Sequence, residues 1–286
     1  MTPFELLEPR SLKEAAGLLG DADPSARPVA GGTAVMLMMK MGVLRPARLV
    51  SLRAVEKRYS EIAAGADGGV RVGALATLSA LEHSSVVQAK APVITRTLRT
   101  LSNVRVRNVA TIGGHLAHGD PHADLPPVLI ALGASVTTVS ARGGRTFPLD
   151  KLHAGYLETT LERGELIAEV TVPAQGRRRA AYLKCTTRSA DDWPALGVAV
   201  ALEADNGTVR DSRIVISAAT NTPVRLTAAE DSLRGTKADD ASLRRVGDAA
   251  ASAADVIADE HGSAAYKREL VRVYVARAIR AALVGE

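Results

Sequence analysis

The sequence predicts an α+β protein with two domains. Its 286 residues exceed the roughly 150 that a single domain commonly uses. Strand-like and helix-like segments alternate up to residue 173, where an apolar strand stops at a proline. The polar, turn-rich run 174–179 follows, and beyond it two apolar strands lead into an alanine-rich helical region. We therefore predict one domain over residues 1–175 and a second over residues 178–286.

The individual elements follow from capping residues, apolar alternation and turns. Ser11 and Glu14 have the spacing of a capping box and predict a short helix after them. The glycine pairs at 68–69 and 143–144 lie between β-type segments, so we expect hairpin turns there. In chain order we expect a helix over 11–19, a strand ending at 30, a helix over 34–40, strands at 48–52, 62–65 and 70–73, a helix from 77, strands at 136–139, 165–173, 197–202 and 212–217, and helices after 223, the last with apolar residues at helical spacing.

The composition excludes several classes of function. The lone Cys185 cannot form an intrachain disulfide, and an iron–sulfur cluster normally takes four thiolates. A net charge of +5 with scattered basic residues and 3% aromatic residues predicts no nucleic-acid binding. No stretch approaches the ~18 consecutive apolar residues of a membrane span, and residues 1–10 lack a signal-peptide pattern. We therefore expect a cytoplasmic protein without a membrane span.

A first glycine loop lies at residues 29–35, where a short strand enters a glycine turn and then a helix. Gly31 and Gly32 can bring bare backbone N–H groups close to a ligand, and the start of the helix favours negative charge. Thr33 adds a hydroxyl group. The loop lacks both the Gly-x-Gly-x-x-Gly fingerprint and a Walker pattern. It suits a phosphate, although a structural turn alone would explain the same residues.

A second glycine loop is followed by a dense polar cluster. Gly113 and Gly114 precede His115, and three histidines and two aspartates fall within residues 115–124. One alternative is a metal-dependent hydrolase that uses this His115–Asp124 cluster, although the breaks at 119 and 121 do not favour it. A solvated polar loop is another alternative. Together, the two glycine loops suggest a ligand with a diphosphate and a polyhydroxyl part, for which Asp124 can accept hydrogen bonds.

Three separated motifs, in this order, resemble the FAD-binding medium subunit of the molybdenum hydroxylase family. The first is Ala30-Gly31-Gly32-Thr33 with Met38-Met39-Lys40 downstream. The second runs from residue 110 to residue 127. The third combines Tyr182-Leu183-Lys184 with residues 188–193. The resemblance covers nearly the whole chain, with one departure, because many members carry Asn or Asp at the position of His115.

The resemblance implies a fold and a set of cofactor-binding residues. Residues 1–175 would form an FAD-binding domain of the PCMH (vanillyl-alcohol-oxidase-like) type with subdomains at about 1–55 and 56–175, followed by a smaller C-terminal domain with a short antiparallel sheet and helices. The first loop would wrap the diphosphate and the second would add backbone donors. Lys184 would approach the isoalloxazine and raise its potential. The FAD-binding residues implied are Val29, Ala30, Gly31, Gly32, Thr33, Ala34, Val35, Leu101, Thr111, Gly113, Gly114, His115, Asp124, Ile167, Lys184 and Trp193.

The resemblance also implies the function and the partners. FAD on this chain would take electrons from [2Fe–2S] clusters on a small iron–sulfur subunit and pass them to an external acceptor. A large subunit with the molybdopterin cofactor would oxidise the substrate, in a dimer of heterotrimers. The chain itself would need no catalytic acid, base or nucleophile and no metal of its own.

Overall fold

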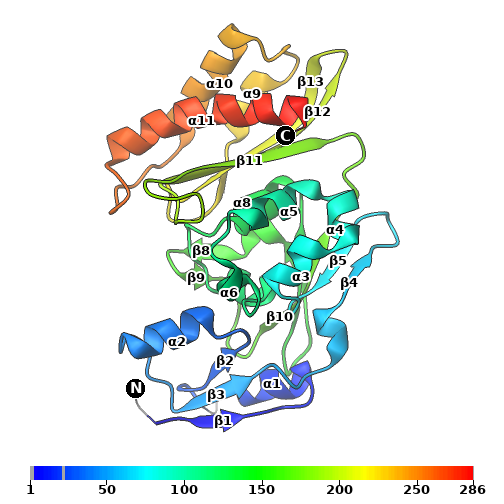
Figure 1. Ribbon diagram of the computed structural model, residues 1–286, viewed down its shortest axis with the longest axis vertical. Coiled ribbons are helices and arrows are strands. Elements are labelled where there is room, and N and C mark those ends of the chain that lie inside the picture. The colour runs from blue at the N-terminus through cyan, green and yellow to red at the C-terminus, as the bar shows by residue number, and fades with distance from the viewer. Residues whose placement is uncertain (1–2, 21–22, 286) are drawn as a thin grey trace.

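The computed structural model describes residues 3–20 and 23–285. Figure 1 shows three layers along the long axis: an N-terminal sheet, a central sheet with helices, and a C-terminal sheet covered by helices. The mixture of helices and largely antiparallel sheets confirms the predicted α+β class. No helix in the described part of the chain is long and apolar enough to cross a membrane.

The N-terminal layer is a small parallel sheet with strand order β1-β3-β2. The predicted capping box is present, because the Ser11 hydroxyl accepts a hydrogen bond from the Glu14 N–H at 3.1 Å. Buried residues of this layer, among them Leu12 and Val50, pack against Leu166 of the central sheet. The elements are β1 (Glu5–Leu7), α1 (Leu12–Leu18), β2 (Arg27–Val29), α2 (Thr33–Lys40) and β3 (Arg48–Ser51).

The central layer is an antiparallel sheet with strand order β4-β5-β10-β6-β7. Both predicted hairpins are present, since β4 pairs with β5 and β6 pairs with β7. Helices pack against this sheet around a large apolar core. The elements are η1 (Lys57–Ser60), β4 (Ile62–Ala64), β5 (Val70–Gly73), α3 (Leu78–His83), α4 (Ser85–Lys90), α5 (Pro92–Arg99), α6 (Val104–Arg107), α7 (Ile112–Ala117), α8 (Leu125–Ala131), β6 (Ser135–Val139), β7 (Thr146–Pro148), η2 (Leu149–Lys151), β8 (His153–Gly155), β9 (Glu158–Thr159) and β10 (Leu166–Val172).

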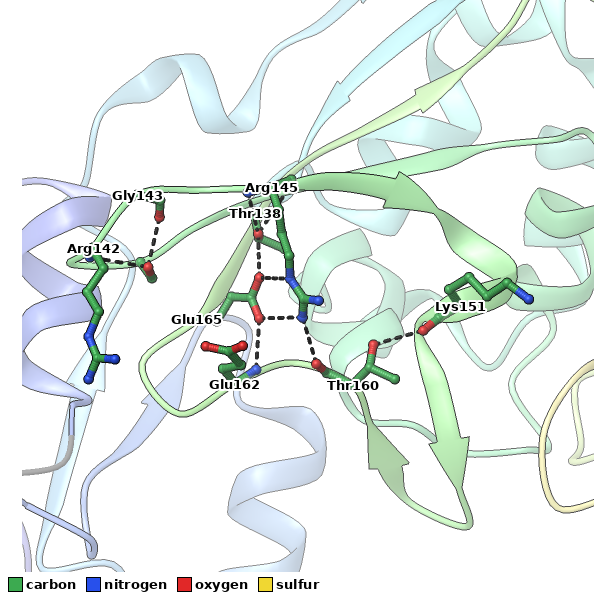
Figure 2. Close-up of polar contacts among 9 residues, drawn as sticks. Thr138, Arg142, Gly143, Arg145, Lys151, Thr160, Glu162 and Glu165 are labelled. Carbon is green, nitrogen blue, oxygen red and sulfur yellow. Dashed lines mark hydrogen bonds and ion pairs between the residues drawn. The ribbon is translucent and has the colours of Figure 1, made fainter.

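A polar cluster at the start of β10 ties the loops of the central layer together, as Figure 2 shows. The Glu165 carboxylate accepts hydrogen bonds from the Thr138 hydroxyl at 2.6 Å, from Arg145 Nε at 2.7 Å and from the Glu162 N–H at 2.8 Å. The neighbouring Arg163 donates to backbone carbonyls of the N-terminal layer, at 3.1 Å to Gly20. This cluster therefore sits where the first two layers join.

The C-terminal layer is an antiparallel sheet with strand order β11-β12-β13-β14. Alternate residues of β12 face two different cores: Val198 and Val200 pack with the C-terminal helices, whereas Ala199 and Ala201 pack with the central layer. Burial of both faces explains the uninterrupted apolar sequence of this strand. The elements are β11 (Arg179–Cys185), β12 (Leu196–Asp205), β13 (Thr208–Ser217), β14 (Val224–Arg225), α9 (Thr227–Leu233), α10 (Asp240–Ala253) and α11 (Ala264–Val284).

Candidate functional site

The first glycine loop presents unpaired backbone donors. Gly32 caps α2 with a φ of 76° and has no side chain that could bond to the first helical amides. The first hydrogen bond of the helix runs from the Met36 N–H to the Gly32 carbonyl at 2.9 Å. The amides of Thr33, Ala34 and Val35 therefore have no acceptor among residues 3–20 and 23–285. A helix start in this state is suited to bind a phosphate group.

The two glycine loops meet at Gly31. A Cβ atom on Gly31 would lie 1.9 Å from the Val109 carbonyl oxygen, a backbone atom that cannot move aside like a side chain. Val109 immediately precedes the second loop, so only glycine permits this close approach. The structure thus brings together two loops that are about eighty positions apart in the sequence, as the predicted shared ligand requires.

The backbone amides of the second glycine loop donate to groups within the chain. Thr111 caps α7, and its hydroxyl accepts a hydrogen bond from the Gly114 N–H at 3.2 Å. The Gly113 N–H donates to the Ala74 carbonyl at 2.8 Å, and a Cβ on Gly113 would lie 2.7 Å from the Ala74 Cβ. The His115 N–H donates to the Thr111 carbonyl at 2.9 Å. In this structure the loop packs against Ala74, the residue that follows β5, and the expectation that its amides contact the cofactor stays a prediction.

His115, which departs from the family pattern, is half-buried, with its ring nitrogen Nε2 turned away from solvent. Burial lowers the pKa of His115 to about 4, so the imidazole is neutral near pH 7. Its Nε2 atom is buried and has no hydrogen-bond partner within the described residues. His115 therefore adds no positive charge to the site.

A buried ion pair joins the central and C-terminal layers. Lys184, on β11, donates from Nζ to the Asp124 carboxylate at 3.1 Å and to the backbone carbonyls of Thr100 at 2.7 Å and Asp192 at 3.1 Å. The second Asp124 oxygen accepts from the Tyr182 hydroxyl at 2.6 Å. Burial raises the pKa of Tyr182 well above its ordinary value, with the Asp124 charge adding to the effect, so the hydroxyl stays a donor. Both carboxylate oxygens of Asp124 thus have partners inside the chain.

The remaining predicted residues lie around this ion pair and the second loop. Leu101 follows Thr100 and is buried in the core, while Ile167 lies on β10, the strand next to α7 and equally buried. Trp193 is 52% exposed and follows Asp192, whose carbonyl binds Lys184. The structure therefore brings Asp124, Lys184 and Trp193 into one region, whereas it places Leu101 and Ile167 in the interior of the fold.

The polar side chains of residues 115–124 pair with one another and with the C-terminal domain. No group of three or more His, Cys, Asp or Glu side chains that could hold a metal ion occurs in the part of the chain that the structure describes. Instead, His122 lies between two carboxylates, with Nδ1 3.3 Å from Asp120 and Nε2 3.0 Å from Asp259. The hydrolase alternative therefore has no support in the described residues, where this histidine pairs with two carboxylates.

Sequence reasoning missed several residues of this region. Asp259 lies 137 positions from His122, and Arg107 supports the turn before the second loop by donating to the Leu101 and Ser102 carbonyls. Arg107 also pairs with Glu82 at 2.8 Å, with both side chains largely buried. A signal was available for Arg107 alone, since it begins the segment that leads into the second glycine loop.

Comparison with known proteins agrees with this arrangement. Residues 2–175 match the FAD binding domain in molybdopterin dehydrogenase, and residues 181–282 match the CO dehydrogenase flavoprotein C-terminal domain. The chain is 30% identical to the carbon monoxide dehydrogenase medium chain of Hydrogenophaga pseudoflava, over 98% of this chain and 96% of that one. It is 31% identical to the nicotine 6-hydroxylase medium subunit of Paenarthrobacter nicotinovorans, over 95% of this chain and 94% of that one.

The likeness extends to solved structures. The carbon monoxide dehydrogenase from Hydrogenophaga pseudoflava that lacks the Mo-pyranopterin moiety has a chain that superimposes with a TM-score of 0.94 at 33% identity, with 99% of each chain covered. Quinoline 2-oxidoreductase from Pseudomonas putida 86 gives 0.93 at 28% identity, with 99% of this chain and 98% of that one covered. The chain therefore belongs to the family of FAD-binding subunits of molybdenum hydroxylases.

Proposed function

We propose that this chain is the electron-transfer subunit of a multi-subunit molybdenum hydroxylase. The observation that carries the proposal is the first glycine loop, where the uncapped start of α2 lies against the segment leading into the second loop. Bound FAD supplies the redox chemistry, because a flavin can accept electrons singly and release them in pairs. The protein supplies binding, orientation and charge. Residues 1–175 act as the FAD-binding domain and residues 178–286 as the C-terminal domain.

The diphosphate of FAD binds at the first loop in this proposal. The amides of Thr33, Ala34 and Val35 donate to it, and Gly31 and Gly32 keep the approach free of side chains. The second loop, from Thr111 to His115, forms the facing wall. The strongest support is chemical, because an anion is the natural acceptor for the unpaired amides at a helix start.

The isoalloxazine lies near the domain boundary in this proposal, with Lys184 and Trp193 beside it. Asp124 acts through Lys184, since the ion pair and the two backbone carbonyls fix the ammonium group in one position. A fixed positive charge favours the electron-rich, reduced form of the flavin and raises its potential. Leu101, proposed to line this region, follows Thr100, whose carbonyl accepts a hydrogen bond from Lys184.

The partners follow from the family. The relatives are medium chains and subunits of dehydrogenases, so we propose a small iron–sulfur subunit as the electron donor and a large molybdopterin subunit as the site of substrate oxidation. A single cysteine on this chain agrees with clusters that reside elsewhere. A dimer of heterotrimers in the cytoplasm is the assembly we propose.

Reconstitution of the purified chain with FAD tests the function. We expect stoichiometric, noncovalent uptake of FAD and no oxidation of substrate by the chain alone. Lys184→Met should lower the flavin potential by about 30 mV or more, which corresponds to about 1.4 kcal/mol for a two-electron couple. Lys13→Met, which removes an exposed lysine on α1, is the matched control and should leave the potential unchanged. A chain that takes up no FAD would refute the proposal.

A further inference from the structure

His122 lies at a junction of the two domains. It follows Pro121, whose carbonyl accepts a hydrogen bond at 2.8 Å from the N–H of Ala218, the residue after β13 of the C-terminal sheet. Its ring contacts Asp120 from its own loop and Asp259 from the loop between α10 and α11. The His122 side chain is 8% exposed, so these contacts are shielded from water. The imidazole therefore connects carboxylates that belong to different domains.

A buried lysine anchors the far side of this junction. Lys267, on α11, is fully buried and donates from Nζ to the Asp259 carboxylate at 2.5 Å and to the Ala218 carbonyl at 2.9 Å. A buried ammonium group is costly unless it is paired, so Asp259 is held in place by the requirement to neutralise it. The position of Asp259, and with it one contact of His122, is thus fixed by the C-terminal core.

The exposed face of this junction carries Trp193. The ring centroids of His122 and Trp193 are 5.6 Å apart at an interplanar angle of 35°. Trp193 is half exposed, and the residue before it is bound through its carbonyl to Lys184. The loop between β11 and β12 is therefore held at two adjacent points, by Lys184 through the backbone and by His122 through the indole.

We propose that His122 is a positioning residue that links the two domains and holds Trp193 against the flavin-binding region. The inference rests on the proposed function, because it places Trp193 beside the isoalloxazine. It gives His122 a structural role that requires neither a bound metal nor direct contact with the cofactor. Without this imidazole the indole would lose the ring against which it packs, and FAD would bind to a less ordered wall.

The charged state of His122 follows from the groups that face it. Burial alone lowers the pKa of His122, but the hydrogen bonds that its ring donates to Asp120 and Asp259, together with the charges of these carboxylates, outweigh burial and raise the pKa. His118, whose Nε2 lies 4.0 Å from the second Asp120 oxygen, faces the junction from the same loop. From the C-terminal domain, His261 lies with its ring centroid 5.2 Å from that of His122, and Lys267 acts through Asp259.

The chain provides its own probe of this contact. Trp193 is its single tryptophan, so tryptophan emission reports on this position alone. An imidazolium in ring contact quenches an excited indole by accepting an electron, whereas a neutral imidazole quenches it far less. In the full-length chain without FAD, we expect the Trp193 emission to rise with pH in one step, with its midpoint above the ordinary histidine value of about 6.5.

Variants assign the step to its residues. His122→Asn should abolish the step and make Trp193 more accessible to a neutral quencher such as acrylamide. Asp259→Asn should keep the step but move its midpoint down by about one pH unit or more, because a carboxylate that favours the imidazolium is lost. His261→Asn is the matched control: it removes the other imidazole near His122 and should leave the step in place.

FAD binding supplies the second readout. His122→Asn should weaken FAD affinity by about threefold to tenfold, the range that one aromatic contact contributes. A wild-type chain without a pH step in its emission, or a step that survives His122→Asn, would overturn the inference even if FAD binds normally. If His122→Asn does not fold, the wild-type titration decides the question, because an emission without a pH step overturns the inference. A chain that shows the step but takes up no FAD would instead refute the proposed function.

Discussion

Glu165 should contribute a large, pH-dependent share of the stability of the FAD-binding domain. Hydrogen bonds from Arg145 hold the pKa of Glu165 at about 2, against an ordinary value of 4.5, and the Thr138 hydroxyl and the Glu162 N–H add to the effect. The difference corresponds to about 3.4 kcal/mol at about 1.36 kcal/mol per pH unit. Because the Arg145 side chain is 46% exposed, solvent screening reduces the contribution to about 2 kcal/mol. Glu165→Gln should therefore lower the free energy of unfolding by about 2 kcal/mol at neutral pH.

The sign of the pH dependence follows from the lowered pKa of Glu165. The stabilisation is present above the unfolded pKa of 4.5 and is lost as pH falls toward about 2. Chemical denaturation of both chains at neutral pH and at about pH 3 measures this, because the difference between them should shrink on acidification. Glu169→Gln, on the same strand, is the matched control: its ion pair with Arg71, at 3.3 Å, is substantially exposed and should contribute less than about 0.5 kcal/mol. A Glu165→Gln deficit that is the same at both pH values would refute the reasoning.

Three further predictions concern the glycine loop and the domain junction. Gly31→Ala should destabilise the chain and abolish FAD uptake in an absorbance titration, because the new Cβ would lie 1.9 Å from the Val109 carbonyl oxygen. Gly17→Ala is the control: its new Cβ meets open space, so it should stabilise the chain by about 0.5–1 kcal/mol. Lys267→Met should cost about 3 kcal/mol or more in denaturant unfolding, since it leaves Asp259 without its buried cation. Because the pKa of His122 is raised in the folded chain, its contribution to stability should be complete below about pH 6.5 and should be lost as pH rises through the raised pKa. Thermal unfolding at a series of pH values measures this loss, and the His122→Asn chain should not show it.

Local sequence signals predicted most of the secondary structure. The helix after Ser11 and the hairpins around residues 67–69 and 143–144 depend on contacts between near neighbours, and the structure contains all of them. The pattern of apolar residues 271, 275, 278 and 282 likewise predicted the buried face of α11. These features are readable because capping, turn formation and helical periodicity act over a few residues.

The polar partners at the site could not be read in the same way. The loop at 115–124 shows a cluster of histidines and aspartates, which suggested a metal as one alternative. Their chemistry depends on Asp259, which contacts His122, and on Lys267, which pairs with Asp259; both residues come from the C-terminal domain. Asp259 lies more than a hundred positions from His122, so no local sequence pattern indicates their contact. The histidines and aspartates of residues 115–124 therefore suggested metal ligands in the sequence, whereas in the fold His122 forms ion pairs.

The candidate site therefore combines residues from both domains. Lys184 and Trp193 belong to the C-terminal part, yet Lys184 is bound by Asp124 and Thr100 of the first part. The strand β12 buries one face against the C-terminal helices and the other against the central layer, so separating the parts would expose the apolar face that includes Ala199. Separating β12 from the central layer would expose apolar surface on both. Hydrophobic packing therefore holds the glycine loops and Lys184 in fixed positions relative to one another. In the proposed function, this fixed relation keeps the charge of Lys184 beside the flavin while electrons arrive and leave.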